Sequence, residues 1–396
     1  MDKTRANAMR EILEEALAQR GRYYSNHFSF SIRFEADDTS AARDTTHFQH
    51  IMQLLKLPKA RELVLMKDNR KPIWTVIGLV QDLDRKISKA DGRSLVIGHY
   101  AGHGAVKDDK LVFFGSQSSR NLFFGFEITL GTPFEDDSSV SVFEKTDVIL
   151  IIDSCYSGNC IRGLGATCRS VEIIASVGAK QQAFGNASDR ARVQNRTFTS
   201  RLADSIALRV GKGDSAISFA EIVEELRSRS NPDRLPEYYL KIGRVGIRIP
   251  VLGQTGQPVH LRESTGHRQT PSSSSAGEGS TTTPAAPHLN AVFTVHLDDD
   301  ASSGDTRKLV QWIHALNPGL GLELTGVYAS RSTVITLGAP WRIWAQLSGL
   351  RGVTLVCESF GRNMLPSLVG QQLPTVKKEN VPFEGKQRSG LEILKR

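Results

Sequence analysis

The stretch VILIIDSCYSG, residues 148–158, decides the predicted fold. Its first five residues are apolar without a polar interruption, which is typical of a central parallel strand buried on both faces. Strands that alternate with helices predict an α/β fold, a mostly parallel sheet flanked by helices on both faces. The expected strands are 28–34, 62–66, 94–100, 147–152, 171–177 and 238–251, and the expected helices are 44–57, one that begins at Pro72, and 198–228 with a loop near 211–213.

Composition divides the chain of 396 residues into five parts. Residues 1–25 carry apolar residues at helical spacing among charges, which predicts an amphipathic N-terminal helix and not a signal peptide. Residues 254–289 are rich in Ser, Thr, Pro, Gly and Gln and lack the apolar content to fold, so they predict a flexible linker. This linker separates the α/β domain, residues 26–253, from a small domain, residues 290–360, which a basic tail, residues 361–396, follows.

The small domain has a different pattern. Its periodicity predicts the order strand, helix, strand, strand, helix, strand, which is that of a ferredoxin-like α+β fold. Such a fold supports many functions, and residues 290–360 contain no catalytic constellation. We therefore expect an interaction or regulatory module that binds a protein partner or a second copy of the chain.

The bulk composition excludes several classes of protein. The net charge is +8, but basic residues are interleaved with acidic ones, so neither nucleic acid nor a membrane is an expected partner. No apolar run is long enough to cross a bilayer. Four cysteines are too few for the disulfide framework of a secreted domain, and they contain no C-x-x-C pair for zinc. The expected compartment is the reducing cytoplasm.

Two motifs place reactive side chains where predicted strands end. GHYAGHG, residues 98–104, carries His103 in a glycine-rich turn, and DSCYSG, residues 153–158, carries Cys155 directly after the apolar strand. Because neighbouring parallel strands end at one edge of a sheet, the thiol and the imidazole can meet there. The imidazole can then accept the thiol proton and return it to a leaving amine. The N–H groups of Gly104 and Cys155 are candidates for stabilising the oxyanion.

These two motifs resemble those of the caspase-like peptidases, and within them the metacaspases and the caspase-domain proteins common in fungi. In that family the histidine of H-Y-[SA]-G-H-G is the base and the cysteine of D-[SC]-C-x-[SA]-G is the nucleophile, and these fall on His103 and Cys155. The separation of about 50 residues is that of caspases, although the Q-A-C-x-G signature is absent. The resemblance covers residues 26–253. It implies a cysteine endopeptidase with a polypeptide substrate and a role in programmed cell death.

The resemblance also implies a specificity. In metacaspase-like enzymes the aspartate two residues before the nucleophile, here Asp153, selects Arg or Lys before the cleaved bond. Strand side chains alternate faces, so this carboxylate can lie on the side of the nucleophile and bind an arginine by two charge-assisted hydrogen bonds. The loop with Asp37 and Asp38 is expected to add to this substrate-binding pocket. Capping of the next helix is the alternative role, for which Ser40 and Asp44 compete.

No cofactor or resident metal is expected. Many metacaspases need Ca²⁺, and the acidic run Glu135, Asp136 and Asp137 offers suitable oxygen ligands, but the family's fuller acidic pattern is missing. An exposed loop is the expectation there. Arg262 and Arg268 lie in the linker and predict self-cleavage, which would detach the small domain.

The remaining cysteines and the second histidine have structural explanations. Cys160, Cys168 and Cys357 are expected to be packing residues, and His99 a core residue of its strand. The main rival to a peptidase is a catalytically silent caspase-like scaffold. Nucleotide binding ranks last, because neither a G-x-G-x-x-G motif after the first strand nor a P-loop motif is present.

Overall fold

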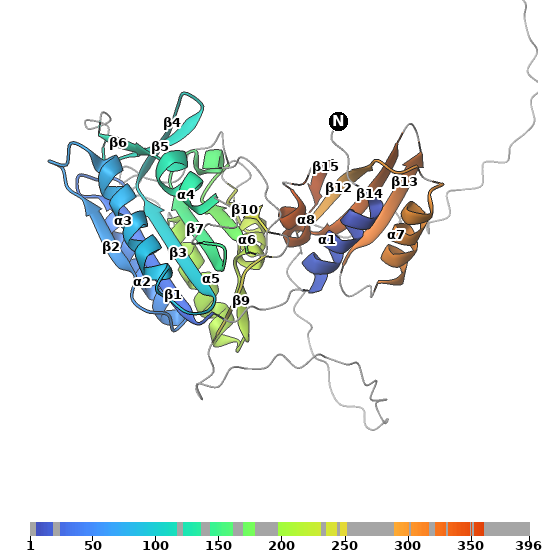
Figure 1. The fold of residues 1–396 in the computed structure, drawn as a ribbon, viewed down its shortest axis with the longest axis horizontal. Helices are drawn as coiled ribbons and strands as arrows, with labels where there is room; N and C mark the ends of the chain where they lie inside the picture. The colour runs from blue at the N-terminus through green and yellow to red at the C-terminus, as the bar shows by residue number, and fades with distance from the viewer. Residues whose placement is uncertain are drawn as a thin grey trace, which may run out of the picture. The chain divides into compact units, whose positions relative to one another are not determined.

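The structure is a computed structural model. Residues 1–360 form one compact unit, and Figure 1 shows the fold. The expected basic tail and nearly all of the expected linker lie outside the described residues. The described residues are 5–18, 24–116, 122–135, 143–160, 169–178, 197–230, 235–243, 246–251, 289–300, 302–316, 321–329, 332–348, 350 and 352–359.

A six-stranded sheet forms the centre of the α/β domain (Figure 1). Its order is β10-β8-β7-β3-β1-β2, and every pair is parallel except β10 with β8. The two middle strands, β3 and β7, are buried along their whole length, as their apolar sequences predict. The strands are β1 (Asn26–Phe34), β2 (Arg61–Leu65), β3 (Ser94–Ala101), β7 (Thr146–Asp153), β8 (Val171–Ala175) and β10 (Glu237–Ile242).

Helices cover both faces of this sheet. On one face, the apolar sides of α2 (Ala41–Leu54), α5 (Phe198–Gly211) and α6 (Phe219–Ser228) pack into one core cluster. On the other face, α3 (Pro72–Ile87) packs into a second cluster. The predicted α/β architecture with a mostly parallel sheet is therefore confirmed.

Two small antiparallel sheets were not predicted. The strands β4 (His103–Lys107), β5 (Lys110–Phe114) and β6 (Phe123–Gly125) form one of them, so His103 begins a strand and does not lie within a turn. The other joins β9 (Ala216–Ser218) to β11 (Arg248–Pro250). The expected helix 198–228 is therefore broken by a strand, and the expected strand 238–251 is two strands in different sheets.

Short helical turns complete this domain. A π-helical turn, η2 (Glu127–Gly131), continues into α4 (Thr132–Glu135), and a 3-10 turn, η3 (Ser157–Cys160), follows β7 closely. Among the helices that the structure describes, none has the length and apolar composition needed to pass through a membrane.

The small domain has the predicted element order. Its four strands form an antiparallel sheet of order β13-β14-β12-β15, and the buried positions of β12 and β14 alternate along each strand. Such alternation is expected where one face of a sheet packs on helices. The elements are β12 (Asn290–Leu297), α7 (Gly304–Ala315), β13 (Glu323–Ala329), β14 (Thr333–Pro340), α8 (Trp341–Leu347) and β15 (Val353–Ser359).

The N-terminal helix α1 (Ala6–Ala18) packs against the small domain, far from it in sequence (Figure 1). Ala6, Met9 and Leu13 are fully buried and join the core cluster that contains the apolar residues of β12 and α7. The Ala6 N–H donates to Asp299 Oδ2 at 2.7 Å. The helix is present as predicted, but its attachment to the small domain was not foreseen.

Candidate active site

The carboxyl ends of β3 and β7 lie side by side. The two strands pair in parallel register up to Ala101 opposite Asp153, and the Gly102 N–H donates to the Asp153 carbonyl at 3.2 Å. The segments that follow these strands carry His103 and Cys155. They therefore leave the sheet from the same edge, as parallel pairing requires.

Gly104 is where the two segments touch. A Cβ atom at this position would lie 2.4 Å from the carbonyl oxygen of Cys155 and 2.8 Å from Ser154 Oγ, closer than real Cβ atoms come. Only glycine permits this approach. Cys155 is a half-buried thiol, and the chain turns immediately after it because Tyr156 has a φ of 58°.

His103 is held on one ring face and at one ring nitrogen. Its ring stacks on Phe114, with the centroids 5.1 Å apart and the planes at 5°, and its Nε2 contacts Oδ1 of Asp38. Its carbonyl accepts a hydrogen bond from the Tyr100 hydroxyl at 2.8 Å. Burial raises the pKa of Tyr100 well above its usual value, and the nearby Asp37 and Cys155 add to this shift. The Tyr100 hydroxyl thus bonds to His103 within electrostatic range of the Cys155 thiol.

Asp153 is buried at the end of β7. Its Oδ2 accepts two hydrogen bonds from Thr199, one from the backbone N–H at 2.9 Å and one from the hydroxyl at 2.8 Å. Burial raises the pKa of this carboxyl, and these two bonds act in the opposite direction. Asp153 is therefore tied to the first turn of α5.

A second buried carboxyl, Asp44, accompanies Asp153. It accepts a hydrogen bond from Thr197 Oγ1. Burial, and next the charge of Asp153, raise its pKa to about 8. No Lys or Arg within the described ranges forms a salt bridge to either carboxyl; Arg201, whose charge lowers the pKa of Asp153, donates to Ser230 Oγ. The charge of Arg43 likewise lowers the pKa of Asp44, so each carboxyl has an arginine within electrostatic range but, among the described residues, no ion pair to it.

Asp44 was missed as a site residue because its sequence position suggested only helix capping. One signal for it exists in the sequence. Asp44, Phe48 and Ile51 have the spacing of one helix face, so an acid stands on the apolar side of α2. An acid in that position must be buried, and burial of a carboxyl calls for a specific partner or a function.

His99 is the buried core residue that the sequence predicted. Its Nδ1 lies 2.8 Å from Ser31 Oγ, its Nε2 lies 3.1 Å from Thr199 Oγ1, and its ring stacks on Phe48 at 4.6 Å. Burial lowers its pKa to about 3, so the ring is neutral at ordinary pH. Through Thr199 it is linked to Asp153.

The two acids in the loop after β1, Asp37 and Asp38, make different contacts. Asp37 Oδ2 accepts hydrogen bonds from the N–H groups of Thr39 and Ala41, so Asp37 fixes the start of α2, while Asp38 contacts His103. One ligand atom each from Asp37, Asp38 and His103 lie within 4.8 Å of one another. Among the described residues, these three form the group that could hold a metal ion. Both carboxylates, however, already contact protein groups: Asp37 accepts from two backbone N–H groups, and Asp38 contacts His103.

Several expected features lie elsewhere. Asp136 and Asp137, with Arg262 and Arg268, fall outside the described residues, as does Cys168. Cys357 was expected to be a packing residue but is exposed, on β15 at the edge of its sheet.

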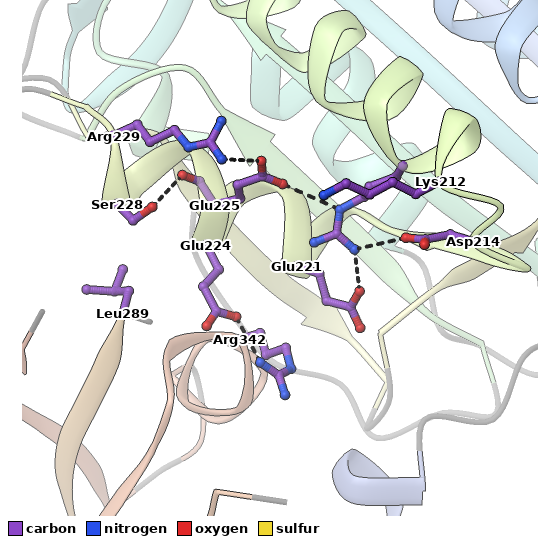
Figure 2. Close-up of a pocket in the computed structure, with 10 residues that line it drawn as sticks. Lys212, Asp214, Glu221, Glu224, Glu225, Ser228, Arg229, Leu289 and Arg342 are labelled. Atoms are coloured by element: carbon purple, nitrogen blue, oxygen red, sulfur yellow. Dashed lines mark hydrogen bonds and ion pairs between the residues drawn. The ribbon is translucent and has the colours of Figure 1, made fainter. Parts of the chain in front are cut away.

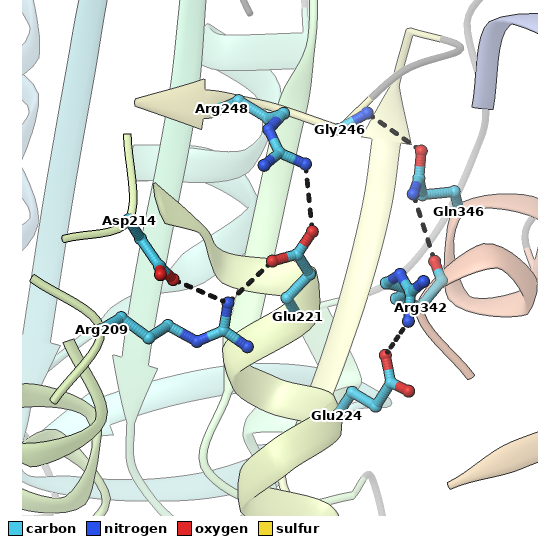
Figure 3. A network of polar contacts seen from close by, with 8 residues as sticks. All are labelled: Arg209, Asp214, Glu221, Glu224, Gly246, Arg248, Arg342 and Gln346. Carbon is cyan, nitrogen blue, oxygen red and sulfur yellow. Dashed lines mark hydrogen bonds and ion pairs between the residues drawn. The ribbon is translucent and has the colours of Figure 1, made fainter. Parts of the chain in front are cut away.

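A cavity of about 510 Å³ is lined by residues other than those at this edge (Figure 2). Its lining is charged and internally paired, because Arg209 contacts Glu221 at 2.8 Å and Arg342 contacts Glu224 at 3.3 Å. Figure 3 shows that Arg248 extends this network through Glu221. The residues that line the cavity include neither a cysteine nor a histidine. It therefore offers no cysteine and histidine pair of the kind found at the sheet edge.

Comparison with known proteins adds no assignment. No family model matches the chain. The search of the curated proteins finds no match either.

Proposed function

We propose that the protein is a cysteine endopeptidase resembling the metacaspases, with Cys155 as nucleophile and His103 as general base. The observation that carries the proposal is the approach of Gly104 to the carbonyl of Cys155, which joins the two motifs at one edge of the sheet. A catalytic cysteine and histidine need this closeness, because the thiol must transfer its proton before it can attack.

The proposed reaction is acyl transfer to the thiol followed by hydrolysis. His103 accepts the proton of Cys155, and the thiolate attacks the carbonyl carbon of the peptide bond. The N–H groups of Gly104 and Cys155 stabilise the oxyanion, and His103 returns the proton to the leaving amine. Water then releases the acyl group, and the thiol is regenerated.

The proposed specificity is for Arg or Lys before the cleaved bond. Asp153 and Asp44 support it, because two buried carboxyls without a salt bridge in the described part of the chain would gain a counter-ion from a cationic side chain. Asp44, protonated at neutral pH, would release its proton as the cation enters. The sequence predicted that Asp38 adds to the substrate-binding pocket; because Asp38 contacts His103, we argue below for a role on that ring in its place.

The test is hydrolysis and labelling by an arginyl substrate and probe. Native protein, Cys155→Ala and Cys357→Ala are each incubated with dye-releasing peptides that end in Arg, Lys or Asp, and with an arginyl activated-ketone probe. Cys357→Ala is the matched control, since it removes an exposed thiol outside the proposed site. We expect Cys155→Ala to lose both activities and Cys357→Ala to keep them.

Other outcomes separate the alternatives. Cleavage only after Asp would refute the acidic pocket and leave the nucleophile intact. Absence of Cys155-dependent hydrolysis and labelling in the native protein would favour the catalytically silent scaffold.

A further inference from the structure

We infer that Asp38 is a positioning residue that fixes the ring orientation and the tautomer of His103. The inference rests on the proposed function, in which His103 is the base. It assigns the exposed carboxylate after β1 to the imidazole, as the third member of a Cys155, His103 and Asp38 arrangement.

The contact is specific to one ring nitrogen. Asp38 Oδ1 contacts His103 Nε2, and the carboxylate side chain is 60% exposed while the imidazole is 16% exposed. An ionised carboxylate only accepts hydrogen bonds, so Nε2 must carry the proton. In the neutral imidazole Nδ1 then has the lone pair, and Nδ1 becomes the nitrogen that accepts the thiol proton.

Stacking on Phe114 does not determine which ring nitrogen of His103 faces Asp38. The two rings are nearly parallel, at 5°, and His103 pairs directly with Phe114 across β4 and β5. A half-turn of the imidazole about its bond to Cβ keeps the same plane and the same stacking, but exchanges Nε2 with a ring carbon. The Asp38 contact distinguishes the two orientations.

The loop that carries Asp38 is itself fixed. Asp37 accepts hydrogen bonds from the N–H groups of Thr39 at 3.0 Å and Ala41 at 2.9 Å, and from the Thr39 hydroxyl. This anchors the backbone beside Asp38 to the first turn of α2. A positioned acceptor raises the fraction of molecules in which the base is correctly oriented before substrate arrives.

The experiment compares Asp38→Asn, Asp38→Glu and Glu35→Gln in the full-length protein. Glu35 is the matched control, since it is a carboxylate three residues earlier that accepts from the Lys67 N–H and does not contact His103. We expect Asp38→Asn to lower kcat for an arginyl peptide by about 10-fold to 100-fold. KM should change by less than about 3-fold, because a positioning residue acts on the reacting state and not on uniform binding. Asp38→Glu should recover part of kcat, and Glu35→Gln should resemble the native enzyme.

A spectroscopic readout tests the orientation without activity. In ¹⁵N-histidine-labelled protein, the ring nitrogen shifts of His103 should report a proton on Nε2. In Asp38→Asn they should report a mixture of tautomers, because an amide can accept from one nitrogen or donate to it.

The outcomes distinguish this inference from the proposed function. An unchanged kcat in Asp38→Asn, or a raised KM with normal kcat, would overturn the positioning role while the peptidase assignment stands. If the native protein shows no Cys155-dependent hydrolysis, the proposed function fails. The ¹⁵N measurement of the His103 tautomer still tests the positioning role in that case. An unchanged tautomer in Asp38→Asn would overturn that role.

Discussion

Gly104 is the residue at which an added methyl group has the clearest consequence. In Gly104→Ala the new Cβ would lie 2.4 Å from the Cys155 carbonyl oxygen, so the segment after β7 or the start of β4 must shift. We expect kcat to fall by about 10-fold to 100-fold, since small displacements of reacting groups are costly. The unfolding free energy should fall by about 1 to 3 kcal/mol.

Gly125→Ala is the control for this change. Nothing lies within 4 Å of a Cβ built at Gly125, so that variant should keep activity and stability. Steady-state kinetics and urea unfolding measure both. Equal behaviour of the two variants would contradict the close contact at Gly104.

Asp44 makes stability depend on pH in a defined direction. Its pKa is raised from an ordinary 3.8 to about 8, so the native state keeps a proton between about pH 4 and pH 8 that the unfolded chain has released. The native state binds more protons there, and the unfolding free energy therefore falls as pH rises. In Asp44→Asn this contribution is absent, and the variant should gain stability relative to the native protein as pH approaches 8.

Urea unfolding at about pH 6.5 and at about pH 8 measures this difference. Below pH 6.5 the buried His99 has the opposite effect on the unfolding free energy. The unfolded chain binds a proton at this histidine there, whereas the native imidazole stays neutral down to about pH 3. Asp68→Asn, at an exposed position, should keep the native slope. Parallel curves for the native protein and Asp44→Asn would refute the shifted pKa.

The sequence predicted a residue's environment correctly where the local strand or helix pattern determines it. His99 was predicted to be a core residue because it lies within an apolar strand, and it is buried. The pairing of Asp44 with Asp153 was out of reach, because it joins α2 to β7 through a core whose assembly no local pattern encodes. Cys357 was misjudged, since a strand at the edge of a sheet can leave a cysteine exposed.

At the scale of elements, the start of α5 is anchored through Thr199. Its hydroxyl donates to Asp153 and lies 3.1 Å from His99 Nε2, so one side chain satisfies groups on two strands. Thr199→Val keeps the shape but removes the hydroxyl. We expect a loss of about 1 to 3 kcal/mol in unfolding free energy, because Asp153 loses one of its two donors on Thr199 and the buried His99 Nε2 loses its hydrogen-bond partner.

Urea unfolding of Thr199→Val measures this loss. Thr46→Val is its matched control, since Thr46 is exposed on α2 and bonds only within that helix, to the Ala42 carbonyl. Thr46→Val should lower the unfolding free energy only slightly. A loss no larger in Thr199→Val than in Thr46→Val would mean that α5 is not anchored through this hydroxyl.

The sequence predicted the elements whose apolar pattern is uninterrupted. The strands β3 and β7, and the helix that Pro72 opens, lie where periodicity placed them. The hairpin of β4 and β5 was not predicted, because it begins within a glycine-rich stretch whose composition favours a turn. Short strands such as β9, with three residues, carry too little pattern to be separated from the helices around them.

At the scale of the whole molecule, α1 changes what cleavage in the linker would do. The sequence suggested that a cut at Arg262 or Arg268 would detach the small domain. However, α1 precedes β1 in the chain and packs on α7 and α8, so it would help to hold the two fragments together, as would the contacts of α8 with α6 and β10. Each fully buried Met or Leu contributes about 1.5 to 3 kcal/mol to such a contact.

We therefore expect the cleaved fragments to stay associated. A recognition site for an unrelated protease is placed within residues 271–284 of Cys155→Ala, the linker is cut, and size-exclusion chromatography follows. The fragments should elute together. Met9→Asp should weaken their association and raise the separated fraction, because it buries a charge in the contact between α1 and the small domain while the contacts of α8 with α6 and β10 remain. Ala8→Asp places the same charge at an exposed position of the same helix and should leave them associated. Separation without any substitution, or equal effects of the two aspartates, would show that α1 does not hold the fragments together.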